Sequence, residues 1–134
     1  VQAGLPTAAE CGGFWYLGRS LEDADGKAWP MADVLPGDGI RVGRLVRFGY
    51  AEMTAKADSM LFCAGETLPI HEFHHWDSTE NGDAFTAAKA NGRQWACGFA
   101  NARLYAGFPH LYWEGTPLPK RFAAAAEQYI KETS

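Results

Sequence analysis

The stretch Ala9–Leu17, which reads AECGGFWYL, decides the fold of this chain. Before it, Leu5–Ala9 is a short apolar run compatible with a strand, and after the cysteine Phe14–Leu17 has room for one or two helical turns. Gly18 is then expected to form the helix C-cap. A strand that stops at small-X-Cys-X-Gly and passes directly into a helix is typical of a nucleophile elbow. The sequence therefore predicts an α/β arrangement around a reactive cysteine.

Cys11 is the candidate nucleophile of this turn. At a helix N-terminus, unpaired backbone N–H groups and the helix dipole favour the thiolate. The N–H of Gly12 is expected to donate to an oxyanion formed on a substrate carbonyl. The alternative is a buried structural cysteine beside a flexible Gly-Gly turn. Cys63 and Cys97 lie in apolar runs that are expected to be strands, and for them the structural interpretation is favoured.

A nucleophilic cysteine needs a base, and in such folds the base is often a distant histidine. Three of the four histidines lie in residues 70–77, IHEFHHWD, and the fourth is His110. On a strand, His71 and His75 would share one face and His74 would lie on the other. His110 ends an apolar run just before a turn, where an α/β catalytic base tends to lie. From the residues alone, His110 and His74 are about equally good candidates.

A metal site is the other interpretation of the histidine cluster. Cys11 or Glu72 would be its further ligand. The spacing matches no strong zinc signature, so no metal is expected and the histidines are predicted to line a pocket.

The rest of the chain alternates short apolar runs with turn signals, which predicts several strands. Asn91-Gly92 lies between two such runs and is the strongest short hairpin signal. Thr116 is expected to cap a helix that begins at Pro117 and carries an apolar face as far as Ile130. The strand-like runs cover residues 31–35, 40–53, 60–64, 68–76, 84–88, 94–99 and 104–111. The expected fold is a strand-rich α/β or α+β layer closed by one C-terminal helix.

Length and composition fit one ordinary globular domain, with 134 residues of which 47% are hydrophobic and 21% charged. The net charge is -4 and no Lys/Arg cluster occurs, so nucleic acid is not an expected partner. No apolar run approaches the ~20 residues that span a bilayer, and Val1–Gly4 does not resemble a signal peptide, so no membrane is expected. Three widely spaced cysteines indicate a reducing, cytoplasmic setting.

Several motifs together resemble the cobyrinic acid a,c-diamide synthases, in order along almost the whole chain from about Pro6 to Ile130. The cysteine turn resembles the nucleophile motif of that family, and His71-Glu72-Phe73-His74 matches its His-Glu-Phe-His motif. The other matching segments are Pro30–Pro36, Phe48–Glu52, Phe108–Tyr112 and Lys120–Phe122.

The resemblance implies the C-terminal portion of a class I glutamine amidotransferase domain, with a flavodoxin-like α/β fold. In that family, cysteine attacks the side-chain amide of glutamine and ammonia is released. Carried over, Cys11 is the nucleophile, His110 the general base and Gly12 an oxyanion donor. His71, Glu72, Phe73 and His74 would line the glutamine pocket.

The resemblance also implies a larger parent enzyme. There an N-terminal synthetase domain uses ATP and Mg²⁺ to activate carboxylates of a corrinoid precursor, which the ammonia converts to amides. Residues 1–134 are expected to be a partial amidotransferase domain that needs no cofactor of its own. The upstream strands and a second oxyanion donor are expected to be missing, so the chain alone should be nearly inactive and is expected to self-associate through an exposed sheet edge.

Two positions depart from the family pattern. Ile70 stands where the family has Gly, and Tyr112 stands where it has a second histidine. Glu114 is a candidate for orienting His110. These departures keep two alternatives open: a non-catalytic binding module, and a class I-like thiol hydrolase such as a peptidase. The acceptor is also open, because nickel-tetrapyrrole a,c-diamide synthases share these motifs.

Overall fold

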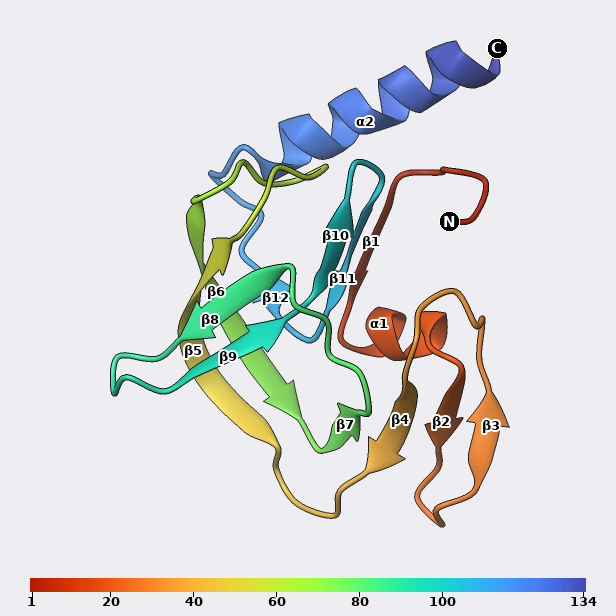
Figure 1. Cartoon of the computed structure of the whole chain (residues 1–134), viewed down its shortest axis with the longest axis vertical. Helices are drawn as coiled ribbons and strands as arrows, with labels where there is room; N and C mark the ends of the chain where they lie inside the picture. The colour runs from red at the N-terminus through yellow and green to blue at the C-terminus, as the bar shows by residue number, and fades with distance from the viewer.

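The cysteine turn begins at a three-stranded sheet with the strand order β1-β11-β10 (Figure 1). The protein is described by a computed structural model that covers residues 1–134. Strand β1 runs parallel to β11, with Glu10 opposite Gly107, and β10 pairs antiparallel with the other edge of β11. Strand β11 is the central strand of this sheet because it pairs on both edges, and every one of its residues is buried. The elements are β1 (Thr7–Glu10), β10 (Phe99–Asn101), β11 (Leu104–Gly107) and the helix α1 (Gly12–Leu17) that follows β1.

A five-stranded antiparallel sheet with the order β12-β6-β5-β8-β9 forms the largest part of the molecule. The predicted hairpin at Asn91-Gly92 is confirmed: it joins β8 to β9, and Gly92 has the positive φ of 85° that favours glycine. At the opposite edge, His110 of β12 lies in register with His71 of β6. The strands are β5 (Arg47–Ala55), β6 (Thr67–His74), β8 (Phe85–Ala88), β9 (Gln94–Cys97) and β12 (His110–Leu111).

A smaller sheet with the order β3-β2-β4-β7 packs beside α1 (Figure 1). Its strands are β2 (Ser20–Glu22), β3 (Ala28–Pro30), β4 (Asp38–Arg41) and β7 (Trp76–Ser78).

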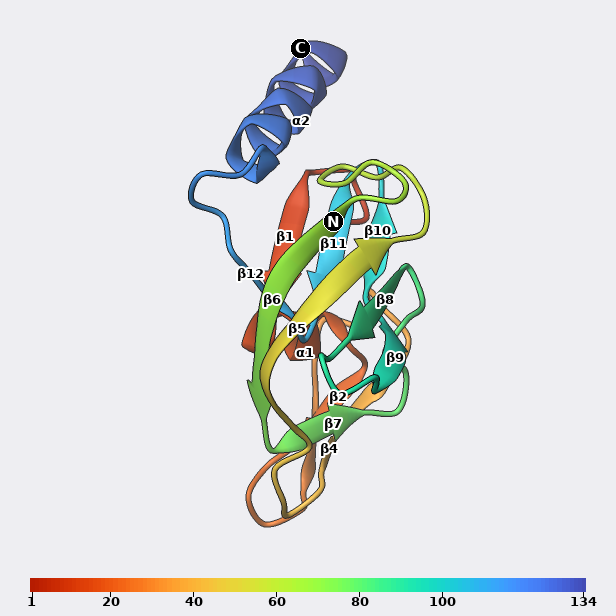
Figure 2. The same ribbon diagram turned by 90° about the vertical axis from the view of Figure 1, so that its left-hand side faces the viewer.

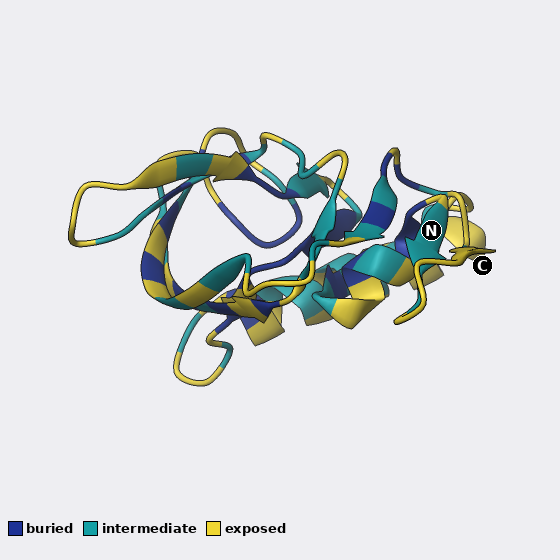
Figure 3. Ribbon diagram, turned by 90° about the horizontal axis from the view of Figure 1, so that it is seen from below, coloured by how far each residue is buried: buried dark blue, intermediate teal, exposed yellow.

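Two hydrophobic clusters support these sheets. Buried and less buried residues alternate along β5 and β6 (Figure 3). The buried side chains of the five-stranded sheet include Met53, Ile70 and Phe85. The second cluster lies under the cysteine turn and contains Phe14, Leu17 and, from the neighbouring strand β11, Leu104 and Ala106. The turn therefore rests on a packed layer rather than on a free loop.

Helix α2 (Leu118–Thr133) closes the chain and extends away from the sheets (Figure 2). The helix proper begins at Leu118, and Pro117 before it already has helical dihedral angles (φ -73°, ψ -7°). The hydroxyl of Thr116 accepts a hydrogen bond from the N–H of Leu118 at 3.4 Å, as expected for the predicted cap. Leu118 is buried, and the predicted apolar face is half-buried at Phe122, Ala125, Ala126 and Tyr129. Ile130 is 60% exposed, so the prediction was wrong only at the last residue of this face. Neither helix combines the length and apolarity that crossing a bilayer requires.

The expected fold class, a mixed α/β structure with several strands and a C-terminal helix, is confirmed. Two predicted strands are wrong. Residues 60–64 form a loop whose apolar side chains enter the core, where Leu61 is 0% exposed. Residues 31–35 instead wrap around the end of α1, where their backbone N–H groups donate to carbonyl oxygens that include those of Tyr16 and Leu17. The apolar residues of the first segment are thus explained by burial in the core. The second segment bonds to the free carbonyl groups at the end of α1 and not to a neighbouring strand.

Candidate active site

Cys11 occupies a sharp turn between β1 and α1. Its backbone has φ 47° and ψ -103°, a conformation that residues other than glycine rarely adopt. The N–H of Cys11 donates to the carbonyl oxygen of Gly107 at 2.9 Å, and its own carbonyl accepts from Trp15 N–H at 3.1 Å. The strand therefore pairs up to the cysteine itself, and the helix begins directly after it. Such strain is stored where a side chain must be presented at a fixed position.

Close packing explains the small residues around the cysteine. A Cβ atom added at Gly13 would lie 3.5 Å from Cβ of Ala9, so helix and strand touch at this point. Phe14 packs edge-on against Phe108 with ring centroids 5.1 Å apart. The predicted strand, turn and helix are present.

Burial raises the pKa of the Cys11 thiol above its ordinary value of 9.0. A hydrogen bond from the backbone of Gly12 acts in the opposite direction, and the negative charges of Glu72 and Glu10 raise the pKa further. Burial and the two negative charges therefore outweigh the effect of the helix N-terminus, and the structure favours the protonated thiol over the expected thiolate. Since the thiolate is the nucleophile, reaction at neutral pH requires a base that takes the proton.

His110 lies at the same edge of the fold as Cys11. Strand β11 pairs with β1 as far as Gly107, and β12 begins only three residues later with His110. The Nδ1 atom of His110 lies 3.7 Å from Oε2 of Glu10, the residue that precedes the cysteine, and the His110 side chain is 45% exposed.

Glu10 is fixed by the segment that carries His110. Its Oε1 atom accepts a hydrogen bond from Trp113 Nε1 at 2.9 Å and a longer one from the N–H of Leu111 at 3.4 Å. Glu114, the acid expected to orient His110, is exposed and forms no ion pair or hydrogen bond with it. Glu10 was not among the residues predicted for the site. A glutamate at the end of an apolar strand, directly before a candidate nucleophile, was the available signal.

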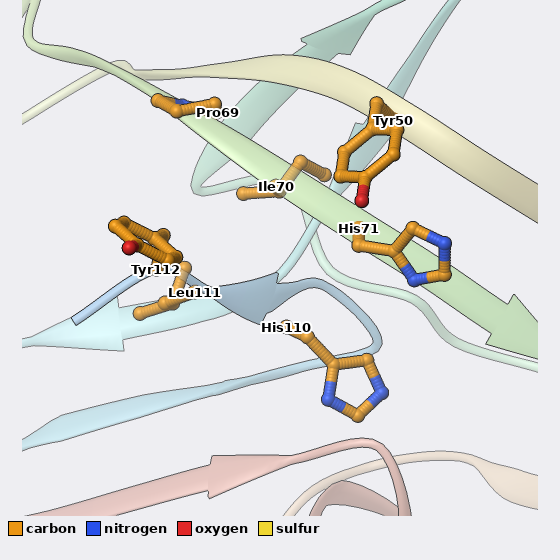
Figure 4. Close-up of a pocket in the computed structure, with 7 residues that line it drawn as sticks. All are labelled: Tyr50, Pro69, Ile70, His71, His110, Leu111 and Tyr112. Atoms are coloured by element: carbon orange, nitrogen blue, oxygen red, sulfur yellow. The ribbon is translucent and has the colours of Figure 1, made fainter. Parts of the chain in front are cut away.

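A concavity of about 400 Å³ opens beside His110 (Figure 4). It lies over the edge where β12 meets β6, and His71 faces it from the strand opposite His110. Its lining is Tyr50, Pro69, Ile70, His71, His110, Leu111 and Tyr112. Of the residues predicted to line a glutamine pocket, only His71 borders this space.

The other three pocket candidates lie elsewhere on β6. Phe73 points outward and is 52% exposed, whereas Glu72 and His74 are each 2% exposed and lie in the interior. Strand alternation thus separates His71 from His74, as predicted. The role of these residues in glutamine binding stays a prediction.

Glu72 is the centre of a buried polar network. Its Oε2 atom lies 2.9 Å from Nε2 of His74, and its Oε1 atom accepts from Trp95 Nε1 at 3.2 Å. Arg47 lies 3.8 Å from the same carboxylate and stacks over the Trp95 ring. The His74 ring stacks on Phe108, with centroids 3.9 Å apart. This network therefore supports the loop that leads to His110.

No group of three or more His, Cys, Asp or Glu side chains is arranged to hold a metal ion. The metal interpretation required the clustered histidines to converge, but β6 places His71 and His74 on opposite faces. Cys63 is exposed in a loop and Cys97 is buried in β9, where burial raises its pKa to about 12. Cys97 is therefore an inert thiol, and Cys63 is an exposed one that lies away from His110.

Comparison with known proteins gives a consistent assignment. The sequence model of the CobB/CobQ-like glutamine amidotransferase domain matches residues 1–117. The chain is 34% identical to the cobyrinate a,c-diamide synthase of Salmonella typhimurium over 96% of its length, and 33% identical to that of Caldanaerobacter subterraneus over 91%. It is 31% identical to the Thermoplasma volcanium enzyme of the same name over 98%. These matches cover 29%, 28% and 30% of the respective relatives, so the chain spans about three-tenths of their length.

Proposed function

Because this chain belongs to the family of CobB/CobQ-like glutamine amidotransferase domains, we propose that it forms the glutaminase part of a cobyrinate a,c-diamide synthase. It would hydrolyse glutamine and supply ammonia for the amidation of corrinoid carboxylates in cobalamin biosynthesis, in the cytoplasm. The observation that carries this proposal is the presentation of Cys11 at a strained strand-to-helix turn, at the edge that also bears His110.

The chemistry follows from the state of the thiol. His110 takes the proton from Cys11, and the resulting thiolate adds to the amide carbon of the glutamine side chain. The carbonyl π electrons move to oxygen, and the Gly12 N–H stabilises that oxyanion. When the intermediate collapses, the C–N bond breaks and His110 gives its proton to the nitrogen, so ammonia leaves. Water, deprotonated by His110, then hydrolyses the γ-glutamyl thioester and restores the thiol.

The amidation step belongs to the rest of the proposed enzyme. The resemblance implies that ATP and Mg²⁺ activate the acceptor carboxylates there. This chain offers no cluster of acidic side chains that fits Mg²⁺, so we assign none of its residues to that step.

Ammonia release from glutamine by the full-length protein tests the proposal. Cys11→Ser should abolish glutamine-dependent ammonia release, and His110→Gln should lower its rate by about 10²–10⁴-fold, the usual contribution of a general base. Cys63→Ser is the matched control and should leave the rate unchanged, because Cys63 is an exposed thiol away from His110. Undiminished glutaminase activity in Cys11→Ser would reject Cys11 as the nucleophile. A folded wild type without glutaminase activity would reject the proposal in favour of a non-catalytic module.

A further inference from the structure

Glu10 supplies the one carboxylate that lies within ion-pair distance of His110. The separation between Glu10 Oε2 and His110 Nδ1 is 3.7 Å. The two other acids near the site do not pair with His110. Glu72 hydrogen-bonds to His74 on the interior face of β6, and Glu114 is exposed. An acid from the strand before the nucleophile therefore faces the proposed base.

The Glu10 carboxylate is held in one orientation. Its Oε1 atom accepts both Trp113 Nε1–H and the backbone N–H of Leu111. The Trp113 ring is itself fixed by edge-on packing on Phe122, with centroids 6.1 Å apart. These two donors use Oε1 and leave Oε2 directed at the imidazole. The Glu10 side chain is 24% exposed, so water screens this interaction only in part.

We propose that Glu10 is the positioning residue for His110, an inference that rests on the glutaminase function proposed above. The carboxylate holds the proton of the neutral imidazole on Nδ1, which leaves the lone pair of Nε2 free to take the thiol proton. At 3.7 Å the two atoms are beyond hydrogen-bond length; such contacts often shorten when substrate binds. The acid thus comes from the residue before the nucleophile and not from a residue after the histidine.

In the proposed reaction, Glu10 stabilises the positive charge that His110 acquires when it takes the thiol proton. When Cys11 adds to the amide, its proton moves to Nε2 and the ring becomes a cation with N–H groups at both nitrogens. The Glu10 carboxylate stabilises this cation without taking a proton from it. When ammonia leaves, Nε2 gives up the same proton and the neutral Nδ1–H ring is restored.

A simple structural anchor is the competing role for Glu10. Glu10→Gln separates the two roles, because the amide oxygen still accepts from Trp113 and Leu111 while the amide N–H₂ replaces Oε2. An anchor would survive this substitution. A positioning carboxylate would not, because an N–H donor does not accept from the Nδ1–H of His110.

The experiment compares full-length wild type, Glu10→Gln and the matched control Glu114→Gln in glutamine hydrolysis. The expected result for Glu10→Gln is a kcat reduced by about 10–100-fold with KM changed less than about twofold. Glu114→Gln should behave as wild type. A second readout is the ¹⁵N NMR signal of neutral His110, assigned by its absence in His110→Gln. The Nδ1–H tautomer should dominate in the wild type and lose population in Glu10→Gln.

The outcomes separate this inference from the proposed function. A wild type without glutaminase activity would reject the proposed function itself. If the wild type is active, a Glu10→Gln protein with wild-type kcat, or with an unchanged His110 tautomer, overturns the positioning role and leaves the amidotransferase assignment intact. Glu10→Asp provides a variant that keeps the charge, and it should recover part of the lost kcat.

Discussion

Glu72 and His74 share a hydrogen bond of 2.9 Å, between carboxylate Oε2 and imidazole Nε2, in the interior beneath the candidate site. The other ring nitrogen of His74, Nδ1, lies 2.8 Å from the carbonyl oxygen of Trp76. Since a carbonyl only accepts, Nδ1 must carry a proton. The Glu72–His74 contact then requires one further proton, carried by either partner, so the pair is bound as a unit with no net charge.

Because of this pair, we expect two substitutions at Glu72 to lower the free energy of unfolding by different amounts. Glu72→Gln retains a donor to His74 and an acceptor for Trp95, so it should lower the free energy of unfolding by only about 1 kcal/mol. Glu72→Ala leaves Nε2 of His74 and the indole N–H of Trp95 without their partner in the interior, and should lower the free energy of unfolding by about 3–5 kcal/mol. Urea denaturation of the full-length protein, followed by tryptophan fluorescence, measures both. Equal losses for the two variants would contradict the shared proton.

The backbone strain at Cys11 predicts a trade between stability and activity. Cys11→Gly should be about 1 kcal/mol more stable than Cys11→Ala, because glycine adopts a φ of 47° without steric cost. Both variants should lack glutaminase activity. Ala8→Gly in β1 is the control, since glycine in a regular strand should destabilise by about 0.5–1 kcal/mol. Thermal unfolding gives the comparison, and a Cys11→Gly protein less stable than Cys11→Ala would argue against strain at the turn.

The raised pKa of Cys11 predicts how its alkylation depends on pH. In a Cys63→Ser background, where Cys11 is the accessible thiol, His110→Gln should react with iodoacetamide at a rate that still rises at pH 9. Burial raises the thiol pKa above 9.0, so the thiolate fraction is not yet saturated there. With His110 present, the reaction at pH 7 should be faster. A rate that levels off below pH 8 in His110→Gln would show that the turn alone produces the thiolate.

The ion pair between Glu66 and Arg121 predicts a pH-dependent contribution to stability. Arg121 hydrogen-bonds both carboxylate oxygens of Glu66 and lowers its pKa to about 2 from the ordinary 4.5. Because the folded-state pKa is depressed, the contribution is complete above pH 4.5 and is lost as pH falls toward 2. The pair is partly exposed, so its contribution should be about 0.5–1 kcal/mol.

Arg121→Met tests this contribution. Its loss of stability relative to wild type should be larger at pH 6 than at pH 2.5, as measured by urea midpoints at both values. A part that does not depend on pH should remain, because Arg121 also donates to the Leu61 carbonyl. The same difference at both pH values would rule out the ion pair as its source.

Local patterns predicted the parts of the fold in which chain neighbours determine the structure. The strand, cysteine turn and helix at residues 7–17 and the hairpin at Asn91-Gly92 are present as expected. The predictions that were wrong concern segments whose structure depends on contacts with residues far away in the sequence. Leu61 and its neighbours are apolar because a loop inserts them into the core. The last turns of α2 make mainly surface contacts, such as the ion pair between Glu132 and Arg103.

The candidate site could be predicted in part for the same reason. The turn geometry of Cys11 is local. The residues alone left His110 and His74 as equally good candidates for the base, and the family resemblance favoured His110. Glu10 was missed because its contact with His110 joins residues a hundred positions apart, through the pairing of β1 with β11. Strand alternation predicted that His71 and His74 would lie on opposite faces of the strand, but it did not show which face is buried. The structure buries Glu72 together with His74, away from the concavity that His71 borders.

Labelling with 6-diazo-5-oxo-norleucine shows whether Cys11 is the nucleophile that attacks glutamine. The full-length protein is incubated with this reagent and then examined by intact-mass analysis and peptide mapping. This glutamine analogue alkylates a cysteine that binds and attacks glutamine. We expect a single adduct on Cys11, protected by glutamine and absent in Cys11→Ser, although Cys63 is the more exposed thiol. A folded protein that forms no adduct, or one labelled on Cys63 instead, would contradict the assignment of Cys11 as the nucleophile of a glutamine amidotransferase.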